Sequence, residues 1–472
     1  MKDMREWLAK AESLGEVEVV RGVNWDLEMG AIAELVERPR GNPALLCDDI
    51  PGYPSGYRVL LNSLGSRERL AMTLGFPKGI TEPEMVHEWR RRIRETKLLP
   101  PRFVGSGPVM ENVDVGEEVD VLKFPVPKWH ELDGGRFIGT GDAIITKEPD
   151  GDWVNLGTYR VMVHDRNHVG LMISTSHHGG WHMQQWFAQG KPMPVAIVVG
   201  ADPLLFLVAS SELPPGLNEY DYAGAVQGKP VEVLNGPITG LPIPAGAEIV
   251  LEGFVDPEER RLEGPFGEYT GYYAGGVRPQ PVVRIEAVYY RNNPVILGAP
   301  PLKPSVSRNY FRGALRAAAL WDVLEAVGVP DITAAWVYEF GQRFNVVAIR
   351  QRYPGHAKQT GRVAASCYGG GGRFTVVVDE DIDVIDIDEV LWAMCTRVDP
   401  DRDIEILREC TSSALDPIIP PERKGNPLAA RVVVDATRPY EWRDRFPEVV
   451  ASSPELKQQV LARWGEALKG II

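Results

Sequence analysis

The stretch DAIITKEPDGDWVNLGTYRVMVHDRNHVGLMI, residues 142–173, decides the fold that we predict for the middle of the chain. Short runs rich in Val, Ile and Thr alternate here with the polar segments EPDGD (148–152) and HDRNH (164–168), which have the composition of hairpin turns. Hairpins join antiparallel strands, and similar short runs recur from about 110 to 300. The pattern therefore predicts a predominantly antiparallel, barrel-like β domain.

Helical patterns flank this β region on both sides and alternate with short apolar strands such as RVLLNSL, RFTVVVD and ARVVVDA. We expect helices at 4–14, 27–37, 82–95, 310–327, 387–395 and 455–468. The stretch KLLPPRFVGSGP is rich in Pro and Gly and predicts a linker. We therefore predict an α/β multidomain fold with an N-terminal α/β domain (1–105), a middle β domain (106–305) and a C-terminal α/β domain with a terminal helix (306–472).

Composition excludes several classes of partner. The 472 residues carry a formal net charge of −14, whereas a nucleic-acid partner requires a basic face. The longest apolar runs, PVAIVVG (194–200) and PLLFLVA (203–209), have the length of strands and are far too short to span a membrane. The four cysteines form no CxxC pair, and the charged N-terminus has no apolar signal segment, which together favour the reducing cytoplasm.

A cluster of histidines follows the middle strands: five of the eight histidines lie between positions 164 and 182. His177 and His178 come after the apolar run VGLMIST and before Gly179 and Gly180, which predicts that they lie at a strand end. Imidazole is the commonest metal ligand and suits Mn, Fe or Zn. Two adjacent histidines do not by themselves establish a metal site, and the pattern does not choose between them.

Two further stretches carry groups that suit a metal or an anion. In NLGTYR, a single strand would send Asn155 and Arg160 to opposite faces unless the chain bulges or bends at Gly157. Arg160 offers a planar fork for a carboxylate or phosphate, and Glu219 follows a Pro-Pro-Gly turn. Asn, His and Glu together make a ligand set for Mn²⁺ or Mg²⁺, with the ion bridging to a cofactor phosphate.

The segment EGPFGE places Glu263 and Glu268 on either side of a turn that Pro265 and Gly267 make rigid. Two carboxylates in one confined site repel, which raises the proton affinity of one of them, while a nearby arginine holds the other ionised. That combination suits proton transfer. The same sequence would also fit two surface acids that flank a turn and have no role in catalysis.

Taken in order, several motifs resemble those of the UbiD-type decarboxylases, which use prenylated FMN. The matching stretches are NLGTYR, SHHGG, LPPGLNEYDYAG, EGPFGEYTGYY, VVVDEDIDVIDIDEVLWAMCTRVDPDRD and VVVDAT, and they span about 100 to 440. The resemblance implies that the middle domain is a flavin-reductase-like split β-barrel that binds prenylated FMN. It also implies that the terminal helix supports a homodimer or homohexamer.

The resemblance also implies residue roles and a reaction. Arg160, Glu263 and Glu268 match the catalytic network, with Glu268 as the proton donor. A Mn²⁺ ion, with a K⁺ ion close by, would be held by Asn155, Glu219 and one histidine; His177 fits the family's S-H-R-G-G form, and a one-residue shift would select His178. The further cofactor contacts implied are Gly157, Thr158, Tyr159 and Ser210. The reaction would be reversible decarboxylation of an α,β-unsaturated or (hetero)aromatic carboxylic acid through a covalent adduct with prenylated FMN, a cofactor supplied by a flavin prenyltransferase.

Two other functions fit parts of the sequence. A metal-dependent hydrolase would use the same His and Glu residues to activate water, but no HExxH spacing is present. A non-catalytic subunit of a multi-subunit carboxylase would keep the fold without needing Arg160, Glu263 and Glu268. The substrate and the physiological direction stay open; Arg308, Asn309 and Arg312 are candidates for holding a second polar group of the substrate.

Overall fold

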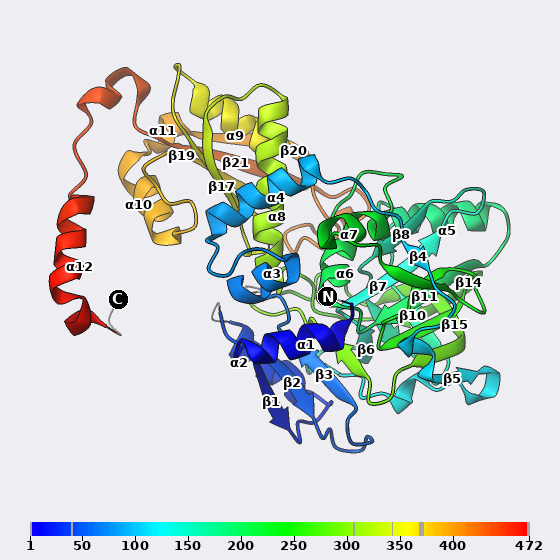
Figure 1. Cartoon of the computed structure of the whole chain (residues 1–472). Coiled ribbons are helices and arrows are strands. Elements are labelled where there is room, and N and C mark those ends of the chain that lie inside the picture. Colours follow the sequence, from blue (N-terminus) through cyan, green and yellow to red (C-terminus); the bar gives the residue numbers. More distant parts are fainter. Residues whose placement is uncertain (1, 39–40, 305–306, 342, 368–371, 470–472) are drawn as a thin grey trace.

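The computed structural model describes residues 2–38, 41–304, 307–341, 343–367 and 372–469. Three successive regions of the chain each form a sheet of their own (Figure 1). One large apolar core joins them, because it contains Trp7 and Trp89 of the first region, Val198 of the second, and Trp336 and Val376 of the third. This confirms the predicted α/β multidomain fold, while the domain limits at 105 and 305 stay predictions.

The first region is a four-stranded sheet in the order β1-β2-β3-β16, with parallel and antiparallel pairs. Its strands are β1 Val17–Arg21, β2 Ala44–Asp48, β3 Arg58–Leu61 and, from far along the chain, β16 Val295–Leu297. Its helices are α1 Met4–Ser13, α2 Glu28–Glu37, α3 Arg67–Leu74 and α4 Glu82–Glu95. Helix α1 begins where the Asp3 side chain accepts from the Glu6 amide, and it buries Met4, Trp7 and Ala11 at helical spacing.

The second region is a nine-stranded antiparallel sheet that curls into a half-barrel (Figure 1). Its strands are β5 Asn112–Val115, β6 Arg136–Gly139, β7 Asp142–Lys147, β8 Val154–Gly157, β9 Val161–Val163, β10 His168–Leu171, β11 Met193–Val199, β14 Ile249–Glu263 and β15 Arg278–Tyr290. The helices α5 His178–Ala188, α6 Pro203–Ala209 and α7 Glu219–Gln227 lie between strands along the chain. The hairpin turns predicted at 148–152 and 164–168 are confirmed, because β7 pairs with β8 and β9 with β10, both antiparallel.

A small sheet of β4 Arg102–Phe103, β12 Glu232–Asn235 and β13 Pro242–Pro244 completes this region. Strand β4 lies inside the stretch predicted as a linker, so that prediction is wrong for these two residues. The cause is backbone pairing: Glu232 and Val233 of β12 lie opposite Arg102 and Phe103.

The third region is a mixed five-stranded sheet in the order β17-β18-β19-β21-β20. Its strands are β17 Ile332–Tyr338, β18 Phe344–Ile349, β19 Phe374–Asp379, β20 Ile404–Thr411 and β21 Leu428–Ala436, and its helices are α8 Ser307–Ala326, α9 His356–Ser366, α10 Ile387–Arg397, α11 Pro400–Asp403 and α12 Pro454–Leu468. The predicted helices are confirmed within a few residues at each end. Helix α12, red in Figure 1, stands apart from the rest of the chain, and none of its described residues is buried.

The run PLLFLVA was predicted to have strand length, and this prediction is wrong because it forms α6. Asp202 is the N-cap, and its side chain accepts from the Leu204 amide. Pro203 occupies the first turn, where its missing N–H costs nothing. Both are helix-start signals in the sequence that the apolar run concealed.

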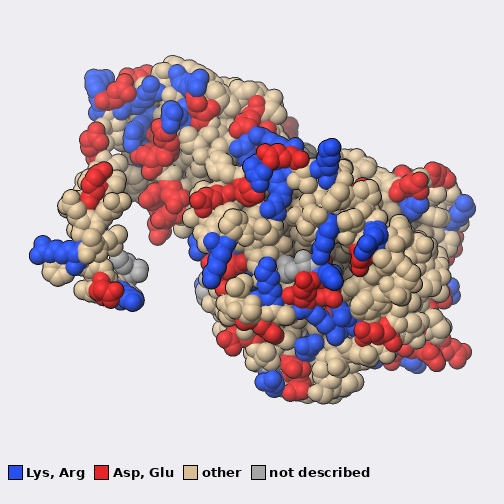
Figure 2. Space-filling view, viewed as in Figure 1, with Lys and Arg blue, Asp and Glu red and all other residues tan. Residues whose placement is uncertain are grey.

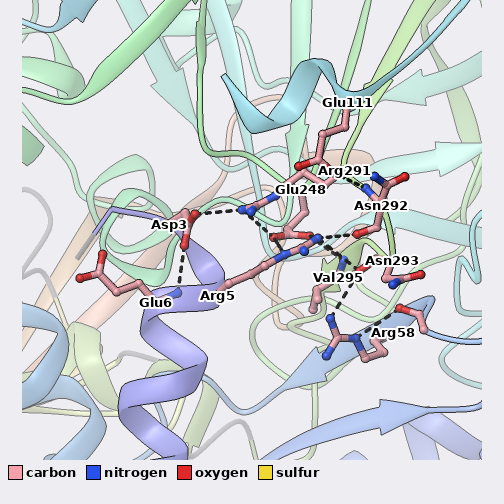
Figure 3. Close-up of polar contacts among 11 residues, drawn as sticks. Asp3, Arg5, Glu6, Arg58, Glu111, Glu248, Arg291, Asn292, Asn293 and Val295 are labelled. Carbon is pink, nitrogen blue, oxygen red and sulfur yellow. Dashed lines mark hydrogen bonds and ion pairs between the residues drawn. The ribbon is translucent and has the colours of Figure 1, made fainter. Parts of the chain in front are cut away.

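One end of the β14–β15 hairpin is fastened to the N-terminal helix by a buried ionic cluster (Figure 3). Glu248, which is fully buried, accepts from Arg5 Nε and Nη2 at 3.0 Å each and from the Val295 amide at 3.2 Å. Arg291 Nη1 donates to Asp3 at 2.9 Å and to Glu248 at 3.4 Å. We call Asp3, Arg5, Glu248 and Arg291 the Glu248 cluster.

The surface mixes both signs of charge. On the face viewed in Figure 2, lysine and arginine side chains lie among aspartates and glutamates rather than in one continuous basic field. Within the described residues, no helix has both the length and the apolar character that a membrane crossing requires.

Candidate active site

Arg160, Glu263 and Glu268 meet in the structure, and we call them the Arg160 cluster. Arg160 Nε and Nη2 donate to the two oxygens of Glu263 at 2.8 and 3.3 Å, and Arg160 Nη1 donates to Glu268 Oε1. All three side chains are buried, with Glu263 fully so. Glu263 is the last residue of β14, and Glu268 lies five residues into the connection to β15.

The charges of the Arg160 cluster do not balance, because one guanidinium faces two carboxylates. Burial opposes the charged form of Arg160, but the charges of Glu268 and Glu263 outweigh it and raise the pKa of the guanidinium. Arg160 therefore stays protonated and holds both carboxylates.

The loop that carries Glu268 is held in place on several sides. Gly264 has a φ of +93°, which favours glycine, and the Pro265 carbonyl accepts from the Gly134 amide at 2.8 Å. The Phe266 ring packs on Phe137 with centroids 4.2 Å apart. The Glu268 amide donates to Tyr272 O at 2.9 Å. The turn is thus anchored, as the sequence predicted.

The segment NLGTYR is not one bulged strand. Strand β8 ends at Gly157, and the chain turns through Thr158 and Tyr159 before β9 begins at Val161. A Cβ at Gly157 would lie 2.3 Å from the Tyr159 ring, so the glycine leaves room for that ring to fold back. Asn155 and Arg160 therefore reach different clusters because the strand stops between them.

Asn155 belongs to a second cluster, with Tyr159 and Glu219. Glu219 Oε1 accepts from Asn155 Nδ2 at 3.1 Å and Glu219 Oε2 accepts from the Leu156 amide at 2.8 Å. The Tyr159 hydroxyl donates to Asn155 Oδ1 at 3.1 Å and accepts from the Gly179 amide at 3.2 Å. Glu219 is the first residue of α7, so strand β8 and the starts of two helices converge here.

This second cluster fits a divalent cation. Glu219 is 2% exposed, and burial raises its pKa to about 7, which hydrogen bonds from Leu156 and Asn155 only partly oppose. A buried carboxylate whose partners are neutral would be stabilised in its charged form by a cation. Within the described residues no three His, Cys, Asp or Glu side chains are grouped so as to hold a metal ion; the predicted ligand set contains only two residues of those types, together with Asn155.

The histidines predicted at a strand end lie instead at the start of a helix. Strand β10 ends at Leu171, and after a turn His177 becomes the N-cap of α5, whose first residue is His178. The His177 ring is accessible and stacks on Tyr159, 5.7 Å between centroids. The His178 ring packs instead against Trp153 and Trp181. Desolvation lowers the pKa of both rings, which favours the neutral, metal-binding form.

Among the other predicted site residues, neither Thr158 nor Ser210 has a described contact to these clusters. Thr158 is half-buried in the turn after β8. Ser210 is the C-cap of α6, and its hydroxyl donates to Leu207 O at 2.8 Å. Arg312 lies in α8, with its guanidinium 5.6 Å from the Phe311 ring centre. The side chains of Arg308 and Asn309 lie outside the described part of the structure.

Sequence reasoning missed the C-terminal side of the site. Arg343 Nη2 donates to the hydroxyl of Tyr269, the residue after Glu268, at 2.9 Å. Arg343 Nη1 lies 3.4 Å from the fully buried Asp416, which also accepts from Arg373. These residues are dispersed over the last third of the chain, so no local pattern could have connected them to EGPFGE.

Three family models match successive parts of the chain. They are the N-terminal domain (residues 8–93), the Rift-related domain (102–304) and the C-terminal domain (309–436) of 3-octaprenyl-4-hydroxybenzoate carboxy-lyase. The chain belongs to the UbiD family. This UbiD chain is 33% identical to the pyrrole-2-carboxylic acid decarboxylase of Pseudomonas aeruginosa over 98% of each chain. It is a UbiD-like carboxy-lyase, and the recognition made from the motifs is confirmed.

Solved structures of UbiD enzymes match the whole fold. The open form of vanillic acid decarboxylase from Sedimentibacter hydroxybenzoicus has a TM-score of 0.87 at 29% identity, with 100% of both chains covered. The UbiD-class enzyme HmfF from Pelotomaculum thermopropionicum, in complex with FMN, has a TM-score of 0.85 at 29% identity, covering 98% of this chain and 100% of that one. An evolved dimeric form of HmfF is in complex with prenylated FMN (prFMN).

Proposed function

We propose that this UbiD chain is a prenylated-FMN-dependent enzyme that reversibly decarboxylates an aromatic or α,β-unsaturated carboxylic acid, with Glu268 as the proton donor. The observation that carries the proposal is the buried Arg160 cluster, in which one guanidinium faces two carboxylates. The decarboxylases of pyrrole-2-carboxylic and vanillic acid support a heteroaromatic or aromatic substrate.

Prenylated FMN would supply an electrophilic centre that takes a covalent bond to the substrate and accepts the electrons left by loss of CO₂. Its phosphate would lie near the N-terminus of α5, which begins at His178. Asn155, Glu219 and His177 would hold Mn²⁺ beside it, because the carboxylate of Glu219 is buried without a cation and His177 contacts Tyr159. We also propose a K⁺ ion close by. The flavin-reductase-like nature of the half-barrel is part of the same proposal.

Glu263 and Glu268 would have different roles in the proposed proton transfer. Glu263 has both oxygens engaged by Arg160, so it fixes the position of the guanidinium. Glu268 has one oxygen on Arg160, and its carboxyl is the one that would deliver a proton to the carbon that has lost CO₂. The reverse reaction would use Glu268 to remove that proton.

Assembly into a homodimer or homohexamer would use α12. One face of this helix exposes Leu456, Val460, Leu461 and Trp464, each at least 41% accessible, while its own chain covers none of them. A contiguous apolar face of this kind is typical of a subunit contact. A flavin prenyltransferase would deliver the cofactor. The cytoplasmic location and the three-domain limits remain proposals from the sequence.

The two alternative functions fit less well. A metal-dependent hydrolase does not explain why Arg160 is placed between two buried carboxylates away from the metal-binding set. A non-catalytic subunit has no physical need for those carboxylates, whose burial costs stability.

The test is to express the chain with and without a flavin prenyltransferase and to measure the absorbance spectrum, the mass of the bound cofactor and the Mn²⁺ content. Prenylated FMN and Mn²⁺ in the first preparation, with CO₂ release from pyrrole-2-carboxylate or vanillate, would support the proposal. A preparation with no flavin in either case would overturn it.

A further inference from the structure

Two cations besides Arg160 act on the surroundings of Glu268, and the proton transfer proposed above does not use them: Arg278 Nη2 faces the same point as Glu268, and the charge of Lys424 interacts with that of Glu268. Arg278 is the first residue of β15 and lies opposite Glu263 in the β14–β15 ladder. Lys424 directly follows the short helix η4 (Pro421–Arg423) of the third region. The two residues therefore approach Glu268 from different sheets of the molecule.

Gly275 lies where Glu268, Arg160 and Arg278 come together. A Cβ at this position would lie 2.7 Å from Glu268 Oε1 and 3.5 Å from both Arg160 Nη1 and Arg278 Nη2. Two guanidinium groups and the proposed proton donor thus face the same point. Because position 275 is a glycine, that point is not occupied by its own side chain.

The side chain of Arg278 lacks polar partners within the described structure. Its Nε is buried and has no hydrogen-bond partner among the described residues, nor does the guanidinium form an ion pair with any of them. Arg284, six residues along the same strand, pairs with Glu286 at 2.6 Å. A buried donor without a partner costs free energy, so Arg278 is suited to receive an anion.

The charges of Arg278 and Glu268 both influence Lys424. Burial lowers its pKa, the negative charge of Asp416 partly offsets this, and smaller effects come from Arg278, which lowers the pKa, and from Glu268, which raises it. Its Nζ donates to Asp416 O at 2.8 Å, which uses one of the three donors of an ammonium group. Asp416 also pairs with Arg343, the partner of Tyr269, so Lys424 is linked through these residues to the loop that carries Glu268.

We propose that Arg278 and Lys424 bind the carboxylate of the acid substrate between them, with the planar guanidinium of Arg278 as the main contact. This inference rests on the proposed function and assigns its carboxylate-binding residues. The Arg fork matches a carboxylate in two hydrogen bonds, and Lys424 adds a point charge from the facing region. The acid enters as an anion and leaves as neutral CO₂, so these contacts favour substrate over product and act mainly on KM.

The experiment measures binding of pyrrole-2-carboxylate and vanillate to the flavin-loaded protein by calorimetry, with pyrrole-2-carboxamide as the uncharged analogue. We expect the wild type to bind at least one acid and to bind the amide more weakly. Arg278→Gln and Lys424→Gln should each raise Kd by about tenfold, the scale of one charge-assisted hydrogen bond. The Kd of Arg278→Lys should lie between that of the wild type and that of Arg278→Gln. In turnover, KM should rise with kcat little changed.

Arg284→Gln on the same strand and Arg423→Gln beside Lys424 are the matched controls, and both should bind as the wild type does. Thermal unfolding identifies any variant that is not folded, and Lys424→Gln tests the inference at an accessible position if Arg278→Gln fails to fold. Equal Kd values for wild type and variants, equal binding of acid and amide, or no saturable binding of either acid at millimolar concentration would each overturn the inference. Failure of the proposed function is distinguished by the absence of prenylated FMN or CO₂ release in the wild type.

Discussion

The β14–β15 hairpin has an ionic cluster with a fully buried glutamate at each end, and the two clusters differ in charge balance. At one end, Arg160 alone faces Glu263 and Glu268. At the other end, Arg5 and Arg291 face Glu248 and Asp3, directly before β14 begins and after β15 ends (Figure 3).

This difference in charge balance distinguishes a catalytic site from a cluster that only stabilises the fold. The Glu248 cluster is neutral with every group in its ordinary ionised form, so no proton needs to move and its contacts only hold α1 to the hairpin. Taken alone, the three residues of the Arg160 cluster carry one more negative charge than Arg160 neutralises, so binding one proton would balance them. An excess buried carboxylate costs stability and supplies a proton acceptor, which is typical of a catalytic site.

The largest effect is expected when Arg160 is removed. Arg160→Met leaves two buried carboxylates facing one another without a cation, and the free energy of unfolding should fall by about 3–5 kcal/mol. Decarboxylation should disappear. Chemical denaturation and CO₂ release measure the two effects. Arg160→Lys keeps the charge and should recover most of the stability but little activity; full activity in Arg160→Lys would contradict the need for the planar fork.

A further buried carboxylate, Glu219, sharpens the comparison because no cation among the described residues pairs with it. Its folded pKa is raised to about 7 from an ordinary value of 4.5, so between these values the folded state binds more protons than the unfolded state. The free energy of unfolding of metal-free protein should therefore fall as pH rises from about 4.5 to about 7, by roughly 3 kcal/mol.

Denaturation of metal-free protein across this pH range measures the effect. Mn²⁺ should restore the stability above pH 7, because it binds the ionised carboxylate. Glu219→Gln should show neither the decline nor the Mn²⁺ effect. A wild-type stability that is flat through this range would contradict the account of Glu219.

Glu248→Gln tests the structural cluster. It removes the charge that Arg5 and Arg291 share, and we expect a loss of about 2 kcal/mol in the free energy of unfolding. CO₂ release per folded molecule should be unchanged. Glu286→Gln, at the Arg284 pair on the same hairpin, is the control and should cost less than about 0.5 kcal/mol. Lost turnover in folded Glu248→Gln would show that the two ends of the hairpin are coupled.

The smallest effect is expected for Tyr159→Phe. The hydroxyl bridges Asn155 Oδ1 and the Gly179 amide, and its loss should cost about 1 kcal/mol of stability. Mn²⁺ affinity, measured by titration, should weaken because Asn155 and the start of α5 lose their link. An unchanged Mn²⁺ affinity would mean that Tyr159 positions neither Asn155 nor the start of α5 for metal binding.

The sequence predicted the parts that local patterns encode. Helix α4 was predicted with both ends correct, and a capping box of Thr81 and Glu84 marks its start. The Arg160 cluster was assembled from NLGTYR and EGPFGE by resemblance. Helix α6 was missed because apolar content outweighed its Asp202 and Pro203 start signals in our interpretation.

The parts that depend on chain folding over long distances could not be predicted. Arg5 and Glu248 are separated by 243 positions, and no motif joins them. The charges of Arg278 and Lys424 likewise interact although the two residues belong to β15 and to the segment after η4, far apart in the sequence. The position of His177 at the start of α5 required knowing that β10 ends at Leu171.

The most direct test compares Glu268→Gln with Glu248→Gln, both loaded with prenylated FMN, for CO₂ release and thermal stability. The account predicts that Glu268→Gln keeps its flavin and its fold but loses about 10²–10⁴ in rate, the range for a general acid, whereas Glu248→Gln loses stability and keeps its rate. A folded, flavin-loaded Glu268→Gln that releases CO₂ at the wild-type rate would contradict the central claim.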